Sequence, residues 1–246
     1  MKGDVVRRCV RMFAFAGLAG FLVAGGALPA TARPVQTPTV ELGSAAGLAP
    51  DGRSVSITVL AQCPERWTVV EALASVSQPQ ASGQASFPLT CTGSFQSFAV
   101  SVPSSGNPFE LGEAHASASV LIKRGRTEQA GDSEVVTVEP TVLVDLADKA
   151  LLQDGGEAVS IDITVACPAG SNGQQSYVNV SQGQSTSGNG VYVPICDGRQ
   201  HTFTVKVQAS EGLFQPGGAH GLTFAFVEAG GQSFSGIDEN TQMQIE

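Results

Sequence analysis

The chain has 246 residues, of which only 14% are charged, and its 22 acidic and 13 basic residues give a net charge of −9. An acidic surface repels nucleic acid and anionic lipid, so neither is an expected partner.

The first 32 residues are predicted to be a secretory signal. They begin with four basic residues, continue with an apolar run over 13–28, and end in small residues with cleavage expected after Ala32. No later stretch approaches the roughly 20 apolar residues of a membrane span. We therefore expect a secreted or extracytoplasmic mature chain with no membrane span. Arg7 and Arg8 leave the general secretory and the twin-arginine routes both open. Removing the signal takes away four basic residues and one acidic residue, which leaves a net charge of −12.

The remaining chain contains the same segment twice. The segment "VSITVLAQCP" (55–64) matches "VSIDITVACP" (159–168), and "CTGSFQSFAVSV" (91–102) matches "CDGRQHTFTVKV" (196–207). Over 55–80 and 91–115, 19 of 51 aligned positions are identical, at an offset of 104 residues that becomes 105 after one insertion. This similarity predicts an internal duplication with units of about 105 residues.

Each unit is predicted to be all-β. Val55, Ile57 and Val59 alternate with polar residues, which is typical of an antiparallel sheet with one buried face. We expect two tandem immunoglobulin-like β-sandwich domains, at 33–140 and 141–246. The expected strands are 38–43, 54–62, 67–77, 85–90, 95–102, 114–123 and 133–139 in the first domain, and 142–147, 158–166, 176–183, 190–195, 201–208, 219–227 and 238–245 in the second.

Four cysteines follow the signal, separated by 28 residues in the first pair and 29 in the second. Four cysteines allow three pairings, and the repeat favours one bridge in each domain, Cys63–Cys91 and Cys167–Cys196. Disulfides agree with an oxidising compartment outside the membrane. The sequence has neither a Cys-x-x-Cys motif nor a Cys/His cluster, so we assign no metal site and no cofactor.

A second repeated phrase, Phe-x-x-Gly-x-Ala-His, falls between the expected fifth and sixth strands. We interpret Phe109, Gly112, Phe214 and Gly217 as structural turn residues, because glycine allows backbone angles that other residues avoid. The histidines that follow are interpreted as strand residues rather than ligands or catalysts, and no catalytic residue is assigned.

The expected sixth strands differ between the copies. After the repeated phrase, the second copy has Leu222, Phe224 and Phe226 on a face that is polar in the first copy. These three residues are a candidate interaction patch, since clustered exposed apolar side chains mark interfaces. A one-residue bulge at Gly221 that turns them into the core is the alternative.

Two short motifs, "CDGRQHTF" (196–203) and "FQPGGA" (214–219), resemble those of an uncharacterised family of secreted actinobacterial proteins. The resemblance covers most of 142–246 and is weaker in the first copy, where Thr92, Gln96 and Leu111 depart from the pattern. It implies a secreted β-sandwich but no known activity. We expect an exported, non-enzymatic protein with a binding or structural role at or outside the cell surface and an unidentified protein or cell-surface partner. The alternative is a small-ligand carrier or exported enzyme with a site at the interdomain cleft.

Overall fold

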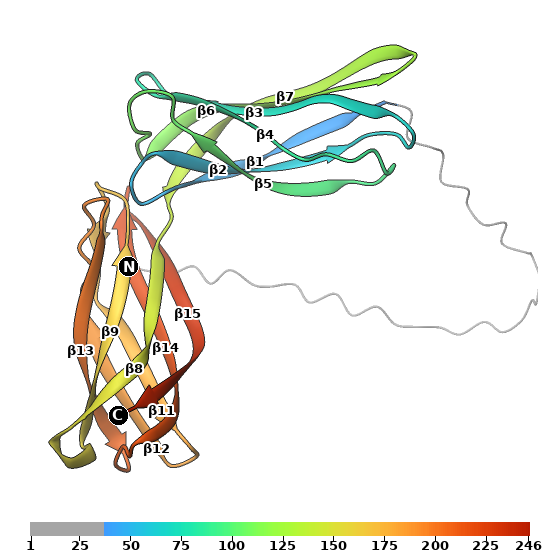
Figure 1. Cartoon of the computed structure of the whole chain (residues 1–246). Helices are drawn as coiled ribbons and strands as arrows, with labels where there is room; N and C mark the ends of the chain where they lie inside the picture. Colours follow the sequence, from blue (N-terminus) through green and yellow to red (C-terminus); the bar gives the residue numbers. More distant parts are fainter. Residues whose placement is uncertain (1–36) are drawn as a thin grey trace, which may run out of the picture. The chain divides into compact units, whose positions relative to one another are not determined.

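The computed structural model describes residues 37–246 and is shown in Figure 1. The predicted signal, residues 1–32, lies outside the described residues. Within 37–246 the protein is all-β, and its single helical element is a short 3-10 turn, η1 (Asp154–Gly156). The strands form two separate sheets, one from each copy of the repeat, as expected for two β domains. We call residues 39–140 the N-terminal unit and residues 143–245 the C-terminal unit.

The N-terminal unit is a seven-stranded sheet with the order β4-β3-β6-β7-β1-β2-β5. Its strands are β1 (Thr39–Leu48), β2 (Ser54–Gln62), β3 (Thr68–Ser77), β4 (Ser82–Ser86), β5 (Gln96–Pro103), β6 (Gly112–Arg124) and β7 (Arg126–Pro140).

The C-terminal unit is an eight-stranded sheet with the order β10-β14-β11-β12-β13-β9-β8-β15, and β14 also pairs with β15. Its strands are β8 (Leu143–Gln153), β9 (Ala158–Ala166), β10 (Asn172–Gly173), β11 (Ser176–Gln182), β12 (Thr186–Tyr192), β13 (Gln200–Glu211), β14 (Gly217–Ala229) and β15 (Gln232–Ile245). Because β14 and β15 pair, the sheet closes on itself.

The first strand of each unit pairs with one neighbour on both sides of a register shift and gains a second, parallel neighbour in its second half. β1 pairs antiparallel with β2 and parallel with β7, and its register shifts between Leu42 and Ala46. At this irregularity the backbone N–H of Leu42 donates to Asp132 Oδ2 at 2.9 Å. The C-terminal unit repeats the arrangement, with the N–H of Leu146 donating to Asp238 Oδ2 at 2.9 Å. A carboxylate thus satisfies the N–H that the shift takes out of the ladder.

Each unit has its own core. Val55, Ile57 and Val59 are buried on β2, whereas the alternating Ser56 and Thr58 are exposed, as period two predicts. The corresponding positions of β9 are also buried, and each unit forms a separate cluster of buried apolar side chains.

Both expected disulfides are present, Cys63–Cys91 and Cys167–Cys196. Cys63 follows the end of β2, and Cys91 lies on the approach to β5, which is paired with β2. Each bridge therefore links two neighbouring strands at one end of the unit.

The expected fourth strands were wrong: they were placed over 85–90 and 190–195, but the strands are β4 and β12, which begin about three residues earlier. Alternating apolar residues make the later segments resemble strands, and Phe87 and Leu89 are indeed buried. Pro88 and Pro194 interrupt both segments, and proline has no N–H to donate to a ladder.

The expected last strands were too short. β6 and β7 form a hairpin that continues to a turn at Gly125, where φ is 76° and Arg124 pairs with Arg126. The residues at this turn are exposed and basic: Lys123, Arg124 and Arg126. The expected strands left 124–132 out, but backbone pairs extend along the whole hairpin.

Candidate interaction face

The repeated turn phrase has the same structure in both units. Phe109 and Phe214 are buried, and their N–H groups donate to the carbonyl oxygens of Gly52 at 2.8 Å and Gly156 at 2.9 Å. The turn glycines have positive φ angles, 118° at Gly112 and 140° at Gly217, in a region that other residues rarely adopt. Both aromatic rings belong to the cores of their units, so the phrase shapes the same turn in each unit.

The histidines of this phrase, His115 and His220, are exposed on β6 and β14. The third histidine, His201, contacts Asp197 Oδ1 through Nε2 at 2.8 Å. This contact lowers the pKa of the Asp197 carboxyl, chiefly through the hydrogen bond from His201. In the N-terminal unit Gln96 takes the place of His201, and its Nε2 donates to the carbonyl oxygen of Thr90 and to Thr92 Oγ1. A side chain at this position therefore fixes the same loop in both copies.

The three predicted patch residues, Leu222, Phe224 and Phe226, lie on the outer side of β14. They are half-buried, whereas the alternating Gly221, Thr223, Ala225 and Val227 face the core. A register shift does occur between Gly221 and Thr223, but the extra residue lies on β15 and the side chains are not turned inward. The alternative in which a bulge buries these residues in the core is therefore wrong.

Phe224 belongs to a row of apolar side chains that crosses four strands. Strand register aligns Val191 of β12, Tyr177 of β11, Phe224 of β14 and Ile237 of β15. Val191, Tyr177 and Ile237 are 60%, 43% and 45% exposed. The ring of Phe226 packs against two members of this row. Its centroid lies 5.5 Å from the ring centroid of Tyr177 and 6.0 Å from that of Phe224.

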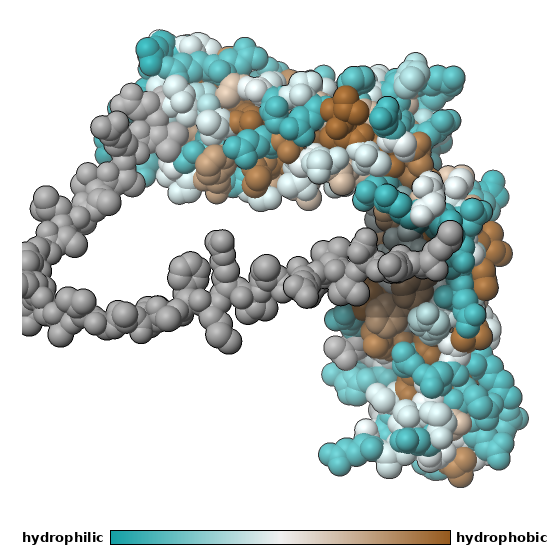
Figure 2. Space-filling view, turned by 180° about the vertical axis from the view of Figure 1, so that it is seen from behind, coloured by the Kyte–Doolittle hydropathy of each residue, from teal (hydrophilic) through white to brown (hydrophobic). Residues whose placement is uncertain are grey.

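The same surface continues beyond β12. Val193 and Ile195 follow Val191 at alternating positions and are about half exposed, while Tyr192 and Pro194 face inward. We define the apolar face as Tyr177, Val191, Val193, Ile195, Leu222, Phe224, Phe226 and Ile237. Figure 2 shows, from one side, that hydrophobic areas interrupt a largely polar surface.

The N-terminal unit has no such row at the matching positions. The strand pairs that correspond to Val191, Tyr177, Phe224 and Ile237 join Ser86, Leu73, Ser119 and Gly131. Pro88 and Thr90 occupy the places of Val193 and Ile195. The duplicated strands are thus paired in the same way, but only one copy has an apolar outer face.

Hydroxyl groups hold the strands of the apolar face from the inner side. Tyr192 is buried, and its hydroxyl lies 3.0 Å from Thr223 Oγ1 and 3.1 Å from the carbonyl oxygen of Phe224. Thr223 Oγ1 in turn donates to the carbonyl oxygen of Tyr177 at 3.1 Å. Burial raises the pKa of Tyr192, so this hydroxyl remains neutral over the ordinary pH range.

Ser176 supplies a third buried hydroxyl group, which bonds the backbone of β14 at Phe226. Its Oγ accepts the N–H of Phe226 at 2.9 Å and donates to the carbonyl oxygen of Gln174 at 2.9 Å. Ser176 and Thr223 are fully buried. We call Ser176, Tyr192 and Thr223 the hydroxyl brace; the matching residues of the N-terminal unit are Ala72, Phe87 and Ala118. The apolar face and its brace therefore occur together in one copy and are both missing from the other.

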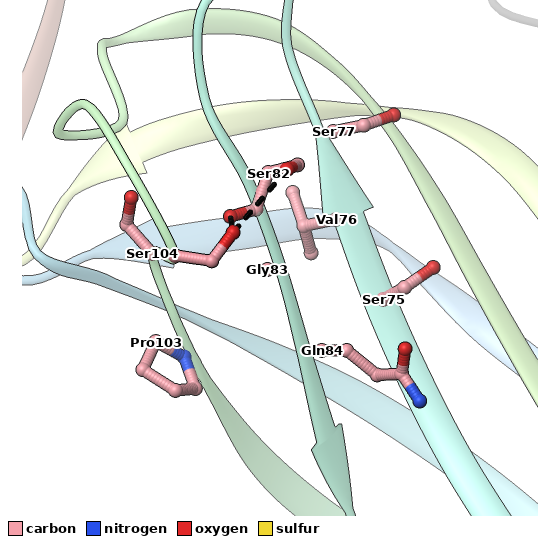
Figure 3. Close-up of a pocket in the computed structure, with 9 residues that line it drawn as sticks. Ser75, Val76, Ser77, Ser82, Gly83, Gln84, Pro103 and Ser104 are labelled. Carbon is pink, nitrogen blue, oxygen red and sulfur yellow. Dashed lines mark hydrogen bonds between the residues drawn. The ribbon is translucent and has the colours of Figure 1, made fainter.

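A shallow hollow in the N-terminal unit is the other surface feature (Figure 3). It is lined mainly by hydroxyl groups from β3, β4 and the end of β5, and Ser105 Oγ donates to the carbonyl oxygen of Ser82 at 2.9 Å. Here β4 meets β5 through one isolated bridge, Gly83–Ser104, whereas β12 and β13 form three pairs. The hollow follows from this shorter ladder, since β5 ends at Pro103.

Neither a metal cluster nor a membrane-spanning helix is found in the described part of the chain. Residues 37–246 hold no group of three or more His, Cys, Asp and Glu side chains placed to bind a metal ion. Over the same range, no helix has the length and apolar character needed to cross a membrane.

The chain matches no model of a known protein family, and no curated protein matches its sequence at a significant level.

Sequence reasoning found three residues of the apolar face and missed the other five, as well as the hydroxyl brace. Tyr177, Val191 and Ile237 are far from Phe224 in sequence and join it only through strand register. A usable signal was present in the repeat, because alignment of the copies places Tyr177 against Leu73 and Val191 against Ser86.

Proposed function

We propose that this protein is an exported, non-enzymatic binding module that contacts its partner through the apolar face of the C-terminal unit. One observation carries the proposal: the row Val191, Tyr177, Phe224 and Ile237 lies on the outer side of four strands, where the other copy has Ser86, Leu73, Ser119 and Gly131. Three members of the row are exposed, and Phe224 is half-buried between them. The largest exposed apolar patch on a monomeric protein, typically about 300–600 Å², is often a functional surface.

The hydroxyl brace supports the proposal. It places polar groups in the core, where the other copy has apolar side chains, and these groups fix the backbone of the contact residues. Three carbonyl and amide groups of β11 and β14 are held by buried side chains. A binding surface that is rigid before contact loses less conformational entropy when a partner binds.

The proposal includes an immunoglobulin-like sandwich for each unit and a location outside the cell. Support for the fold comes from the strand order, in which β1 joins the group β4-β3-β6-β7 to the group β2-β5. Support for the location comes from one disulfide in each unit. Membership of the secreted actinobacterial family that the motifs resemble also remains a proposal.

Site-specific photocrosslinking tests the proposed function. The photoreactive residue p-benzoylphenylalanine is placed at position 224 in one variant and at position 119, its match in the N-terminal unit, in the control. Irradiation of cells that export the protein should then give a crosslinked product from position 224 alone. That product should be lost when Val191→Asp is added to the apolar face.

Equal crosslinking from positions 224 and 119 would contradict the proposal, as would no crosslinking from either. Val191 is mostly exposed, so its replacement by Asp leaves the core intact. A circular dichroism melt of each variant verifies that the fold is retained.

A further inference from the structure

We infer that the partner is a second copy of this chain, packed face to face over strands β12, β11, β14 and β15. The inference rests on the proposed function and names the partner of the same surface. It follows from the charge, the size and the residue types of the apolar face.

The charge of the C-terminal unit restricts how two copies can meet. Residues 141–246 include 11 acidic and three basic residues, so two copies repel each other across most of their surface. The apolar face is free of this conflict. No outward side chain of β11 or β12 is charged. The same holds for β15 from Ser233 to Ile237 and for the part of β14 between His220 and Glu228.

The uncharged polar residues around the apolar face complete a typical interface pattern. Asn179, Ser181, Ser187, Asn189 and Ser235 border the apolar centre on the outer side. Specific interfaces combine an apolar centre with a polar rim. Amide and hydroxyl groups both donate and accept hydrogen bonds, so this rim can pair with a copy of itself across a two-fold axis.

The size of the face suits a weak dimer. Four strands about 4.8 Å apart, with outward positions over about 25 Å of β14, give a footprint of roughly 500 Å². Specific interfaces bury at least about 600 Å² of surface on each partner. We therefore expect a dissociation constant in the range of roughly 10–100 µM rather than a permanent dimer.

The residue types favour a second sheet over a sugar chain. Val191, Val193, Ile195 and Ile237 are β-branched aliphatic residues, the kind that fills the space between two packed sheets. Of the five exposed side chains of the face, only Tyr177 has a ring that could stack on a sugar, because Phe224 and Phe226 are half-buried and pack on each other and on Tyr177. The apolar face therefore has the composition of the inner side of a β-sandwich, exposed on an outer side.

Sedimentation velocity of the purified chain without its predicted signal tests the inference, over about 1–300 µM, a range that brackets the expected dissociation constant. The wild type should convert from monomer to dimer. Phe224→Ser combined with Tyr177→Ser should raise the dissociation constant at least about 10-fold. Val191→Asp should do the same from an exposed position. The matched control Leu73→Ser, on the outer face of the N-terminal unit, should leave it unchanged.

Salt distinguishes this dimer from one held by ion pairs. Raising NaCl from about 0.05 to about 0.5 M should tighten the dimer, because screening weakens the repulsion between two acidic units. An ion-paired dimer would weaken under the same change.

Each other result overturns the inference. A wild type that stays monomeric at every concentration excludes the second copy; the proposed function survives if position 224 still crosslinks to a different protein or to a glycan. A dimer that persists in Val191→Asp, or that weakens as much in Leu73→Ser, uses another surface. Absence of both dimer and crosslink from position 224 rejects the inference and the proposed function together.

Discussion

The outer faces of β6 and β14 show how the two copies have diverged. Both strands pair with equivalent neighbours, and both follow the same turn phrase, with Phe109 and Phe214 buried in their cores. Outward side chains differ most, with Ser117 and Ser119 on β6 against Leu222 and Phe224 on β14. The two copies share the turn and the strand pairing that build the fold, and their sixth strands differ most on the outer side.

The inner changes follow the outer ones. Ala72, Phe87 and Ala118 of the N-terminal unit correspond to Ser176, Tyr192 and Thr223 of the C-terminal unit. All three substitutions place a hydroxyl where it bonds the backbone of a strand that carries the apolar face. The apolar face therefore occurs together with its support in the layer beneath it, and the following experiments examine what the two copies share and where they differ.

The disulfides give the largest expected effect and establish whether the units unfold independently. Replacing Cys63 and Cys91 together by Ala, or Cys167 and Cys196 together, should each lower the free energy of unfolding of its own unit by about 3–4 kcal/mol. The bridges span 28 and 29 residues, so the two effects should be similar. Trp67, the only tryptophan, reports the N-terminal unit by fluorescence, while circular dichroism reports both. A change in Trp67 unfolding after loss of Cys167–Cys196 would contradict independence.

The aspartates at the register shifts of β1 and β8 test what the copies have retained. Asp132→Ala and Asp238→Ala should each destabilise their own unit by about 1–3 kcal/mol, because the N–H of Leu42 or Leu146 loses its acceptor in a partly buried place. Urea denaturation measures both. Glu134→Ala, an exposed change on β7, is the control and should have little effect. Very different losses from Asp132 and Asp238 would show that the register shift is not equivalent in the two units.

The hydroxyl brace tests what the copies do not share. Thr223→Ala and Tyr192→Phe should each cost about 1 kcal/mol, and the double variant should cost less than their sum because the two hydroxyls bond each other. Thermal unfolding of the four proteins gives this coupling. The reverse change, Ala118→Thr in the N-terminal unit, buries a hydroxyl without a tyrosine partner and should destabilise. Strict additivity would mean that the brace is not a single network.

The smallest expected effect concerns pH. The pKa of Asp197 is lowered in the folded state, chiefly by the bond from His201, so this contact stabilises at pH values above the ordinary Asp range. The contribution is lost as the pH falls through the folded pKa, below about pH 4. We expect a slight extra loss of stability of the C-terminal unit in acid, absent in His201→Gln, which copies Gln96. Melting curves recorded between about pH 2 and pH 7 measure this loss of stability. Equal acid sensitivity in both proteins would refute this role.

The sequence predicted most of the fold because two signals can be read without knowing the structure. The repeat is found by comparing the chain with itself, and the alternation of residues such as Val55, Ile57 and Val59 lies within a single strand. β2 was predicted at its exact bounds, and both disulfides followed from the alignment of the copies. β4 was misplaced, because its Ser, Gly and Gln residues have low strand propensity and pairing with β3 determines its position.

The interaction face was predicted only along one strand. Alternation placed Leu222, Phe224 and Phe226 on one side of β14, but it could not say whether that side faced the core. The neighbours Tyr177 and Ile237 depend on cross-strand register, which a single strand does not encode. The brace was missed for the same reason, since Tyr192 and Thr223 meet only after β11, β12 and β14 have paired.

The turn between β6 and β7 offers a place to open the chain. A single glycine, Gly125, joins two strands at exposed basic residues, and the backbone pairs continue to Arg124 and Arg126 on either side. An exposed tip of this kind tolerates insertions, because the added residues need not disturb any ladder bond. A fluorescent protein or an affinity tag inserted after Gly125 would label the molecule on the N-terminal unit, and the apolar face of the C-terminal unit would keep its own sequence unaltered.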